Sequence, residues 1–499
     1  MRRKLTTLLF ISLAAILISG LAFSGCARET PAPSPVLTDP IEIESGYISG
    51  IVRGEAGEEV HVYRGIPYAA PPVGDLRWKP PQPVTPWSGT RVCTTFSDIA
   101  PQILGSPHAG ISQSEDCLYL NVLTPAKYAT DRLPVMVWMH GGGYVAGHGN
   151  ETLFNALPLP QHGVVLVTVN MRLGVLGLMA HPLLSQESPN DVSGNYMCLD
   201  MIAALQWVQK NIAAFGGDPD NVTIFGESGG SRKVIALIAS PLAEGLFHKA
   251  IGESGVIWGT PHSNLLPLKD IEAIGEELFA RLGVDKEADP LAAARALSWE
   301  KIIEVDSVMA QEAGKDWGNW DITVDGWFMP DMPANIFQAG EQNAVPFIVG
   351  GNLGEITGPG TILMPEIIPT SVEMFSGASK AGVEAYAYIF DQVPSKWRQE
   401  GCIASHAMEL PYVFGAVDIV MEWASAMGLA GAKSPDAGLT EADRRVSEAM
   451  MSMWTQFAKT GNPSVEGLVT WPAYEATTDQ YLYITDPLEV RSGFSQIGP

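Results

Sequence analysis

Residues Asn221–Gly230, with the sequence NVTIFGESGG, decide the fold of this chain. The β-branched and aromatic run Val222–Phe225 predicts a short strand, and the apolar run Val234–Ile238 predicts a helix soon after it. Between them, glycines stand two positions before and two positions after Ser228. A serine on so sharp a strand-to-helix turn has a strained backbone. The strand and the helix approach closely there, and side chains at the glycine positions would collide. The pattern indicates a reactive serine at the start of a helix.

Chance is the alternative interpretation, because a chain with 51 glycines can contain G-x-S-x-G without function. The surrounding pattern argues for function. Leu133–Met139 and Val164–Val169 are almost wholly apolar, which is typical of parallel strands buried on both faces. Strands alternate with helical patterns, so we expect an α/β fold with a mostly parallel mixed sheet flanked by helices, and residues 260–320 as a helical excursion. The other expected strands are 59–68, 247–254, 345–350, 384–390 and 481–484, and the long helices are 195–215 and 442–459.

A serine hydroxyl needs a base to remove its proton, and the base needs a carboxylate to orient it. In enzymes with this type of serine turn, the chain order is serine, acid, histidine. Three of the nine histidines follow Ser228, namely His248, His262 and His406. His248 enters an expected strand, which favours a structural role, and His262 leaves little chain for an acid. We therefore predict that His406 is the base.

The acid should follow a strand between Ser228 and His406. Glu355 does so, because it comes after the expected strand 345–350 and a glycine-rich turn. A surface carboxylate is the alternative interpretation of Glu355, and its rivals for the role are Asp321, Asp325 and Asp391. We predict Glu355 as the acid, which completes a Ser228–Glu355–His406 catalytic triad.

A glycine run follows the buried strand 133–139, in the segment His140–Tyr144. Glycines let backbone N–H groups surround one oxygen, and loss of one such donor typically costs about 2.7–4 kcal/mol of barrier. We predict an oxyanion hole formed by the amides of Gly142, Gly143 and Gly229. A phosphate-binding loop is the alternative, but no G-x-x-x-x-G-K-[ST] pattern is present.

Two further residues are expected to support this site. Ser254 lies in Gly252–Gly255, which imitates the serine turn but lacks the second glycine, so we interpret Ser254 as a buried hydroxyl that steadies the acid or the base. Glu227, directly before Ser228, is expected to lie behind the catalytic residues. No metal signature is present, neither H-E-x-x-H nor a Cys/His cluster, so we expect no metal and no cofactor.

The N-terminus resembles an export signal. Arg2, Arg3 and Lys4 precede an apolar run, and the run closes with small residues and Cys26. We expect a signal peptide over 1–25, a lipidated Cys26 with a proline-rich tether over 26–40, and one hydrolase domain over 41–499. A plain secretory signal and an uncleaved anchor helix are the alternatives. The protein would then be exported to the bacterial periplasm or cell surface, with membrane contact through the lipid only.

Charge and cysteine content narrow the class further. The formal net charge of −25 becomes −28 without the three basic residues near the N-terminus, and such an acidic chain repels nucleic acid. If Cys26 is lipidated, four cysteines remain. Cys93 and Cys117 are close in sequence, so either a small disulfide between them or two free thiols is expected. Cys198 begins an apolar helix and is expected to be a buried thiol.

These motifs occur in the order known from one family. The chain resembles the type B carboxylesterases, which include cholinesterases and bacterial p-nitrobenzyl esterases, from about residue 42 to residue 485. The resemblance implies an α/β-hydrolase fold and hydrolysis of carboxylic esters through an acyl-enzyme, with the family triad on Ser228, Glu355 and His406. The matching blocks are 63–69 (YRGIPYA), 115–122 (EDCLYLNV), 140–144 (HGGGY), 170–174 (NMRLG), 215–230 (FGGDPDNVTIFGESGG) and 409–415 (ELPYVFG).

Departures from the family pattern bear on the substrate. Gly229 stands where the family usually has alanine, and Cys93 is displaced from the usual first loop cysteine. Residues 101–114 contain no aromatic side chain, which argues against a cholinesterase because a quaternary ammonium would lack its π partner. The short span from Glu355 to His406 implies an open site for bulky or varied esters.

Three functions from different classes follow from the sequence. The leading hypothesis is an exported serine carboxylesterase acting on a small ester substrate. A lipase acting on long-chain glycerides is the first alternative. A non-catalytic, neuroligin-like binding protein is the second, and the presence of all three triad residues argues against it. The natural ester and the oligomeric state do not follow from the sequence.

Overall fold

The computed structural model describes residues 39–102, 110–256, 265–315, 317–358, 364–420 and 438–498. Residues 1–35 and 36–499 form separate units, and the elements below all belong to the second unit. The expected signal peptide, Cys26 and all but the last two residues of the tether lie outside the described residues.

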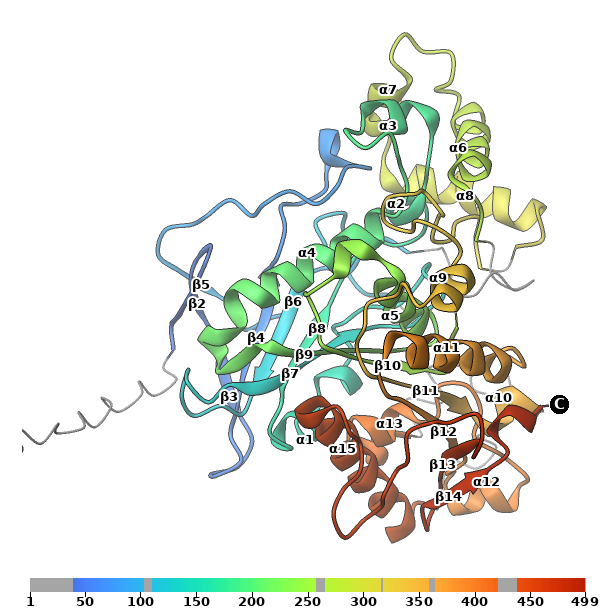
Figure 1. Cartoon of the computed structure of the whole chain (residues 1–499). Helices are drawn as coiled ribbons and strands as arrows, with labels where there is room; N and C mark the ends of the chain where they lie inside the picture. Colours follow the sequence, from blue (N-terminus) through green and yellow to red (C-terminus); the bar gives the residue numbers. More distant parts are fainter. Residues whose placement is uncertain are drawn as a thin grey trace, which may run out of the picture. The chain divides into compact units, whose positions relative to one another are not determined.

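An 11-stranded mixed sheet runs through the second unit (Figure 1). The run β13-β12-β11-β10-β9-β7-β8 is parallel throughout, and β14, β6, β4 and β3 add antiparallel neighbours at the two ends. The expectation of a mostly parallel mixed sheet is confirmed. In spatial order the strands are β14 (Glu489–Ser492), β13 (Gln480–Ile484), β12 (Ala385–Phe390), β11 (Phe347–Asn352), β10 (Lys249–Glu253), β9 (Gly217–Glu227), β7 (Leu133–Met139), β8 (Val165–Val169), β6 (Tyr119–Thr124), β4 (Val60–Pro67) and β3 (Ile51–Arg53).

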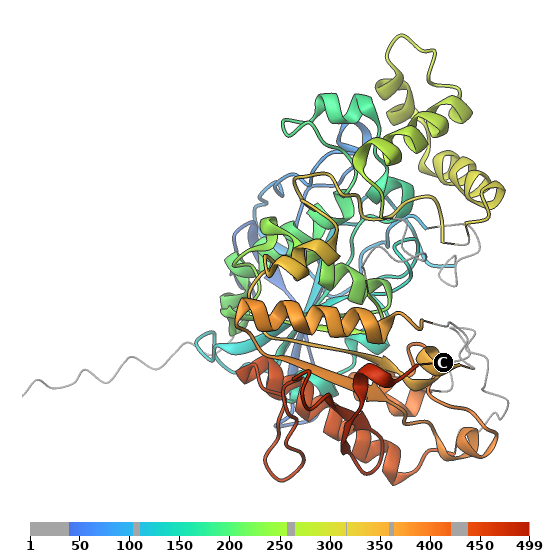
Figure 2. The same ribbon diagram turned by 45° about the vertical axis from the view of Figure 1, so that its right-hand side comes forward.

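Helices cover both faces of this sheet, which is why its central strands are apolar on both sides. Along β7, Val135 and Val137 enter one hydrophobic core, whereas Met136 and Trp138 enter the other. The first core is covered by α4 (Tyr196–Asn211), α5 (Gly229–Ala239) and α11 (Ile367–Ala381). The second is covered by α13 (Leu410–Val413) and α15 (Glu441–Thr460), which lie below the sheet in Figures 1 and 2.

The expected helical excursion is present in the described part of residues 260–320. It contains α6 (Leu268–Leu282), α7 (Pro290–Ala296) and α8 (Trp299–Glu312), drawn in yellow-green at the upper right of Figure 1. The remaining elements are short: α1 (Pro158–Gln161), α2 (Gly174–Leu178), α3 (Pro182–Glu187), α9 (Pro333–Ala339), α10 (Leu353–Thr357), α12 (Ser395–Gln399), and a small sheet of β1 (Ile41–Ile43), β2 (Gly46–Ser49) and β5 (Thr90–Val92).

Element boundaries differ from expectation where the backbone turns left-handed. The helix expected over 195–215 begins at Tyr196 because Asn195 has φ 53°, and after Asn211 it tightens into a 3₁₀ turn over Ile212–Phe215. The strand expected over 247–254 ends at Glu253 because Ser254 also has φ 53°. Both residues support the site described below or its surroundings.

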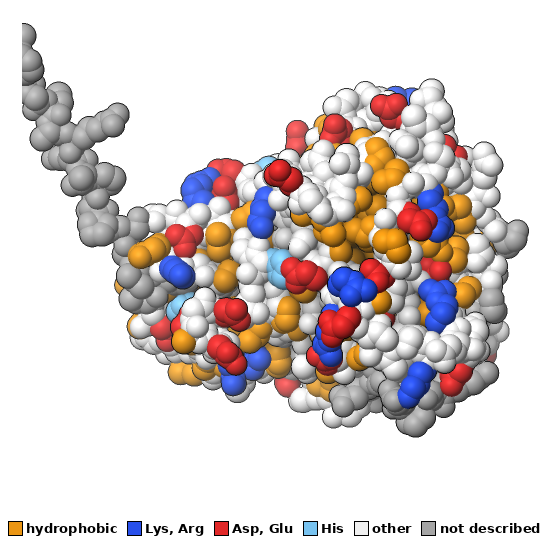
Figure 3. Space-filling model, turned by 90° about the horizontal axis from the view of Figure 1, so that it is seen from below, with side chains coloured by type: hydrophobic (Ala, Val, Ile, Leu, Met, Phe, Trp, Pro, Cys, Tyr) orange, Lys and Arg blue, Asp and Glu red, His pale blue; other side chains and the backbone are white. Residues whose placement is uncertain are grey.

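Figure 3 shows the face on which α15 lies in Figure 1. Acidic and basic side chains are interspersed there, with hydrophobic patches between them and no continuous basic area on this face. Among the helices of the described residues, none combines the length and hydrophobicity needed to cross a bilayer.

Candidate active site

Ser228 lies at the turn between β9 and α5 with φ 56° and ψ −121°. Such a conformation costs about 1–3 kcal/mol and persists only where the surroundings impose it. Here Gly226 and Gly230 allow the close approach that imposes it. A Cβ on Gly226 would lie 2.7 Å from the carbonyl carbon of Gly230, and a Cβ on Gly230 would collide with the carbonyl oxygen of Met139. The packing around the serine therefore agrees with the steric requirement predicted from the sequence.

His406 and Glu355 are in direct contact. Nδ1 of His406 lies 2.5 Å from Oε2 of Glu355, and both side chains are buried. Glu355 belongs to α10, directly after β11, and its Oε1 accepts the backbone N–H of Asn352 at 2.5 Å in a capping box. Because the backbone holds one carboxylate oxygen, the other is fixed in place to orient the imidazole.

Glu227 lies on the other side of the imidazole. Its Oε1 is 3.3 Å from Nε2 of His406, so the ring sits beside the residue that precedes Ser228. Burial alone would lower the pKa of His406, but Glu227 and Glu355 outweigh burial and raise that pKa to about 9. Burial also raises the pKa of Glu227 well above its ordinary value. Among the neighbouring groups, Glu227 does most to raise the pKa of His406, and Glu355 comes next.

The segment His140–Tyr144, called the glycine loop below, follows β7 and borders the serine. Gly142 and Gly143 have φ 94° and 57°, which favours glycine at both positions. Within the described residues, their amide N–H groups donate to no protein acceptor. A Cβ on Gly229 would lie 2.7 Å from the nitrogen of Gly143, and Gly229 opens α5, where the N–H has no partner in its own helix. Two of the three residues predicted for an oxyanion hole, Gly143 and Gly229, therefore lie in close contact, and Gly142 directly precedes Gly143.

Ser254 belongs to a buried hydrogen-bond chain that leads to Glu355. Its Oγ donates to Oε1 of Glu409 at 2.5 Å, and Nδ2 of Asn352 donates to Oε2 of the same carboxylate. Asn352 caps the helix that carries Glu355, so Ser254 is linked to the acid through two other side chains. Burial, and then Glu355, raises the pKa of Glu409 to about 7.

Glu409 and Asn352 were not predicted from the sequence. Glu409 stands three positions after His406 and opens the matching block 409–415, and Asn352 stands three positions before Glu355. This spacing, with polar side chains close to both the acid and the base, is the signal that could have identified them.

The rival residues that the structure describes have partners other than the predicted triad. His262 lies outside the described residues. The other four have these partners: Asp321 accepts from Arg232 at 3.0 Å, Asp325 accepts from Asn195 at 2.9 Å, Asp391 accepts from Tyr483 at 2.7 Å, and Nδ1 of His248 accepts the backbone N–H of Val222 at 3.1 Å.

Cys93 and Cys117 are free, buried thiols, so the structure does not contain the disulfide that was one of the two expectations. Backbone hydrogen bonds hold Cys93 against two other segments. Its N–H donates to the carbonyl of Ser49 at 2.7 Å, and its carbonyl accepts from the N–H of Arg64 at 2.8 Å. Cys117 instead precedes β6. Cys198 is a buried thiol in α4, as expected.

Trp317 lies against the glycine loop. A Cβ on Gly143 would be 2.5 Å from Cε3 of its indole, yet the side chain of Trp317 is 57% exposed. Asp306 in α8 holds two residues that come soon after Trp317. Its Oδ1 accepts from Nε1 of Trp320 at 2.8 Å and from Nδ2 of Asn319 at 2.9 Å. Trp317 thus forms an apolar wall beside Gly143 of the glycine loop, which no sequence pattern predicted.

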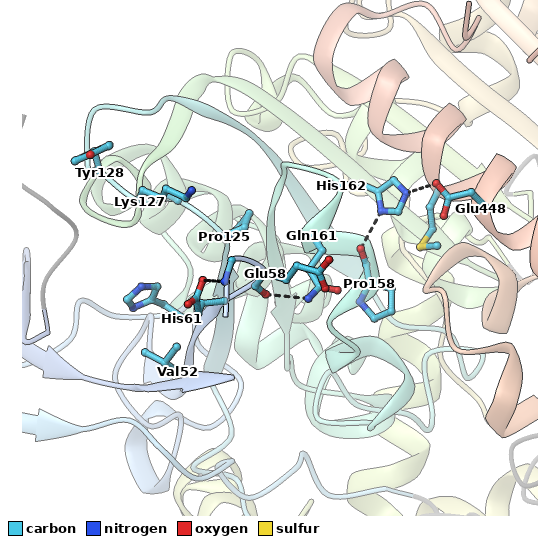
Figure 4. A pocket seen from close by; sticks show the side chains of 14 residues that line it. Val52, Glu58, His61, Pro125, Lys127, Tyr128, Pro158, Gln161, His162 and Glu448 are labelled. Carbon is cyan, nitrogen blue, oxygen red and sulfur yellow. Dashed lines mark hydrogen bonds and ion pairs between the residues drawn. The ribbon is translucent and has the colours of Figure 1, made fainter. Parts of the chain in front are cut away.

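A cavity of about 970 Å³ lies away from these residues (Figure 4). His61, Lys127 and Tyr128 line one part, and His162 and Glu448 form a hydrogen-bonded pair in another. Tyr128 precedes the start of β7, whereas the glycine loop follows the end of β7. The cavity therefore lies toward the opposite ends of the strands from the glycine loop. Across the described residues, no group of three or more His, Cys, Asp or Glu side chains is arranged to hold a metal ion.

Comparison with known proteins relates this geometry to a family. The model of the carboxylesterase family matches residues 38–372 and 366–496 of the chain. The fumonisin B1 esterase of Sphingopyxis macrogoltabida is 34% identical, over 92% of this chain and 89% of that protein. The para-nitrobenzyl esterase of Bacillus subtilis (strain 168) is 32% identical, over 89% of this chain and 95% of that protein.

Solved structures show the same likeness in three dimensions. A PNB esterase superposes with a TM-score of 0.76 at 31% identity, over 91% of this chain and 96% of that one. A thermophilic PNB esterase gives a TM-score of 0.77 at 30% identity, over 91% of this chain and 97% of that one. The sheet and its helices have the α/β-hydrolase fold.

Proposed function

From the premise that this chain belongs to the carboxylesterase family and is a carboxylic ester hydrolase, we propose that it is a serine esterase working through an acyl-enzyme. Ser228 is the nucleophile, His406 is the base, and Glu355 orients the base. The observation that carries the proposal is the 2.5 Å contact between His406 and Glu355, made beside the strained turn that presents the serine.

In the first half of the reaction, Oγ of Ser228 attacks the ester carbonyl while Nε2 of His406 takes the hydroxyl proton. The negative charge that develops on the carbonyl oxygen is met by the amides of Gly142, Gly143 and Gly229. Among the described residues these donors have no protein acceptor to leave, so they need little reorganisation when the charge forms. His406 then returns the proton to the alcohol, the C–O bond breaks, and an acyl-serine remains.

In the second half, water replaces the alcohol. His406 removes a proton from water as the oxygen attacks the acyl carbonyl, and the proton passes to Oγ of Ser228 as the acid product leaves. Glu355 orients the imidazole and stabilises its protonated form in both halves. Its contact with Nδ1 of His406 and its bond to the Asn352 N–H support that role.

Ser228→Ala tests the nucleophile, with Ser379→Ala as the control because Ser379 is an exposed serine on α11. With p-nitrophenyl butyrate, loss of a triad nucleophile is expected to lower kcat on the order of 10⁶-fold, whereas the control retains wild-type kcat. Wild-type activity in Ser228→Ala would reject the assignment.

A fluorophosphonate probe separates an enzyme from a binding protein. Covalent labelling of the wild type and its loss in Ser228→Ala are expected, because the probe reacts only with an activated serine. An unlabelled, folded wild type would instead support the binding-protein alternative.

The substrate proposal is an ester of varied or bulky shape, since the span from Glu355 to His406 is short for the family. A panel of esters that varies acyl length and alcohol size tests it. A steep rise in rate when a long-chain glyceride passes from solution into emulsion would support the lipase alternative.

Export with lipidation of Cys26 is proposed on the basis of the basic start, the apolar run and the small residues before the cysteine. In a bacterial host, the wild type should sediment with membranes, and Cys26→Ala should lose that association. An unchanged membrane fraction in Cys26→Ala would favour an uncleaved anchor helix.

A further inference from the structure

Lys233 is a fully buried lysine in the helix that begins at the serine turn. It lies in the second turn of α5 and has 0% exposure. Its Nζ donates to the carbonyl oxygen of His140 at 2.9 Å. His140 is the first residue of the glycine loop, so the lysine holds the loop at its start.

No carboxylate pairs with this ammonium group among the described residues. The titratable groups that face it are Arg232 on α5, His140 and Tyr144 in the glycine loop, and the thiol of Cys198 on α4; the Tyr144 ring centroid is 6.0 Å from Nζ. A buried, unpaired charge opposes folding, and methionine would fill similar space without that cost. A lysine kept under these conditions indicates a role beyond packing.

The glycine loop packs closely against the serine turn. Lys233 holds His140 by a hydrogen bond, Gly141 lies so near the turn that an added Cβ would be 3.4 Å from Cβ of Ser228, and Gly143 packs on Gly229. Because the peptide bond is planar, the direction of the His140 carbonyl sets the direction of the following N–H and of the chain that carries the next amides. The lysine contact is a hydrogen bond from a charged side chain to the backbone of the loop.

We propose that Lys233 is a positioning residue for the glycine loop, whose ammonium group fixes the His140 carbonyl and thereby aims the amides at the oxygen of the reacting ester. This inference rests on the proposed ester hydrolysis at Ser228. The lysine touches neither substrate nor the serine hydroxyl, so it acts on the transition state through the loop and not on substrate binding.

Protonation of Lys233 offers a readout that packing alone would not produce. Burial lowers the pKa of Lys233 to about 7. Below that pH the side chain is a charged donor to the carbonyl, and above it the side chain is a neutral amine that makes a weaker hydrogen bond. The contribution of Lys233 to kcat should therefore be largest near pH 6 and shrink toward pH 9.

Lys233→Met tests the proposal, because it removes the charge and the donor while nearly keeping the volume. Lys249→Met is the matched control. Lys249 is also a buried lysine whose pKa is lowered by burial. It begins β10, at the far end of the strands from Ser228, and its Nζ donates to Oδ1 of Asn221 in β9. The measurements are kcat and KM with p-nitrophenyl butyrate from pH 6 to 9, urea unfolding at each pH, and the rate of fluorophosphonate labelling.

Lys233→Met is expected to lower kcat and the labelling rate about tenfold at pH 6, with KM within about twofold and no fall in the urea midpoint. The ratio of wild-type to variant kcat should narrow toward pH 9, and Lys249→Met should keep kcat within about twofold of wild type. An unchanged kcat at pH 6, or a pH-independent loss together with a lower urea midpoint, overturns the proposal.

Lys233→Gln keeps the test decisive if the methionine variant does not fold. Its side chain is shorter and uncharged, so kcat at pH 6 should again fall, and wild-type kcat in this variant would also overturn the proposal. If the proposal for Lys233 is wrong, the wild type is still active and is still labelled at Ser228. If the proposed esterase function is wrong, the wild type itself is inactive and unlabelled.

Discussion

The Nε2 atom of His406 lies 3.3 Å from Oε1 of Glu227, the residue directly before Ser228. On the opposite ring nitrogen, Nδ1 contacts Glu355. The imidazole therefore lies between two buried carboxylates. In the proposed mechanism, Glu355 orients the ring, and Glu227 faces the nitrogen that exchanges a proton with the serine. This arrangement makes the pH dependence of the reaction a direct probe of the site.

Glu227→Gln is expected to shift the acid limb of kcat/KM to lower pH by about one unit. The base must be neutral to accept the serine proton, and among the neighbouring groups the charge of Glu227 does most to raise the pKa of His406. Without that charge the ring loses its proton at lower pH. Profiles of kcat/KM from pH 5 to 10 for both proteins measure the shift. A limb that does not move would show that Glu227 is already protonated, the direction in which its burial drives its pKa.

Glu409→Gln is expected to make stability less sensitive to pH. The folded-state pKa of Glu409 is raised from 4.5 to about 7, so between these values the folded protein holds a proton that the unfolded chain has released. The wild type therefore loses stability as pH rises through this window, and glutamine cannot titrate. The free energy of unfolding of the variant, minus that of wild type, should be about 1–3 kcal/mol more positive at pH 8 than at pH 5.

Urea unfolding at the two pH values checks this prediction for Glu409. Glu304→Gln, on the exposed side of α8, serves as the control and should show no such difference. An equal change at both pH values would mean that Glu409 ionises in the folded protein as it does in the unfolded chain.

Trp317→Ala is expected to raise KM for esters with flat aromatic groups. Stacking on an aromatic side chain contributes about 0.5–1.5 kcal/mol, which corresponds to roughly 2–10-fold in KM. A naphthyl butyrate should show this rise, and methyl butyrate should not. Because the side chain is 57% exposed, the free energy of unfolding should change by no more than about 0.5 kcal/mol.

Val308→Ala is the matched control for Trp317, since Val308 is an exposed hydrophobic residue on α8 in the same excursion. It should leave both KM values unchanged. Equal rises for the naphthyl and methyl esters in Trp317→Ala would place the indole outside the ester-binding surface.

Gly229→Ala is expected to lower kcat several-fold without loss of stability. The added Cβ would lie 2.7 Å from the nitrogen and 3.1 Å from Cα of Gly143, so the glycine loop must move away from the serine. Alanine also removes glycine's backbone entropy cost of about 0.5–1 kcal/mol, which favours the folded state. Steady-state kinetics and urea unfolding measure the two effects. Wild-type kcat would show that the loop yields without misaligning its amides.

The parts of the fold carried by local pattern could be predicted from the sequence. The apolar run 133–139 has the same bounds as β7, because a parallel strand covered on both faces needs apolar residues at every position. The strand, turn and helix around Ser228 could be predicted for a similar reason, since the glycine spacing reflects how closely β9, α5 and β7 approach.

Contacts between distant segments could not be predicted in this way. Asn352 meets Glu409 only because the end of β11 and the loop after β12 lie side by side, and no local pattern encodes that meeting. Lys233 follows Arg232 at the start of α5, and two adjacent basic residues give no indication that one of them is buried with its acceptor at His140. The free state of Cys93 likewise depends on its backbone pairing with β2 and β4 and not on its distance from Cys117 along the chain.

The order of the strands has a consequence for biosynthesis. Ser228 follows β9, whereas Glu355 follows β11 and His406 follows β12. A polypeptide emerging from the ribosome therefore contains Ser228 and the glycine loop long before it contains His406. If His406 is the base, as we propose, fragments that stop short of it lack the group that deprotonates the serine, and turnover can begin only after residue 406 has been synthesised.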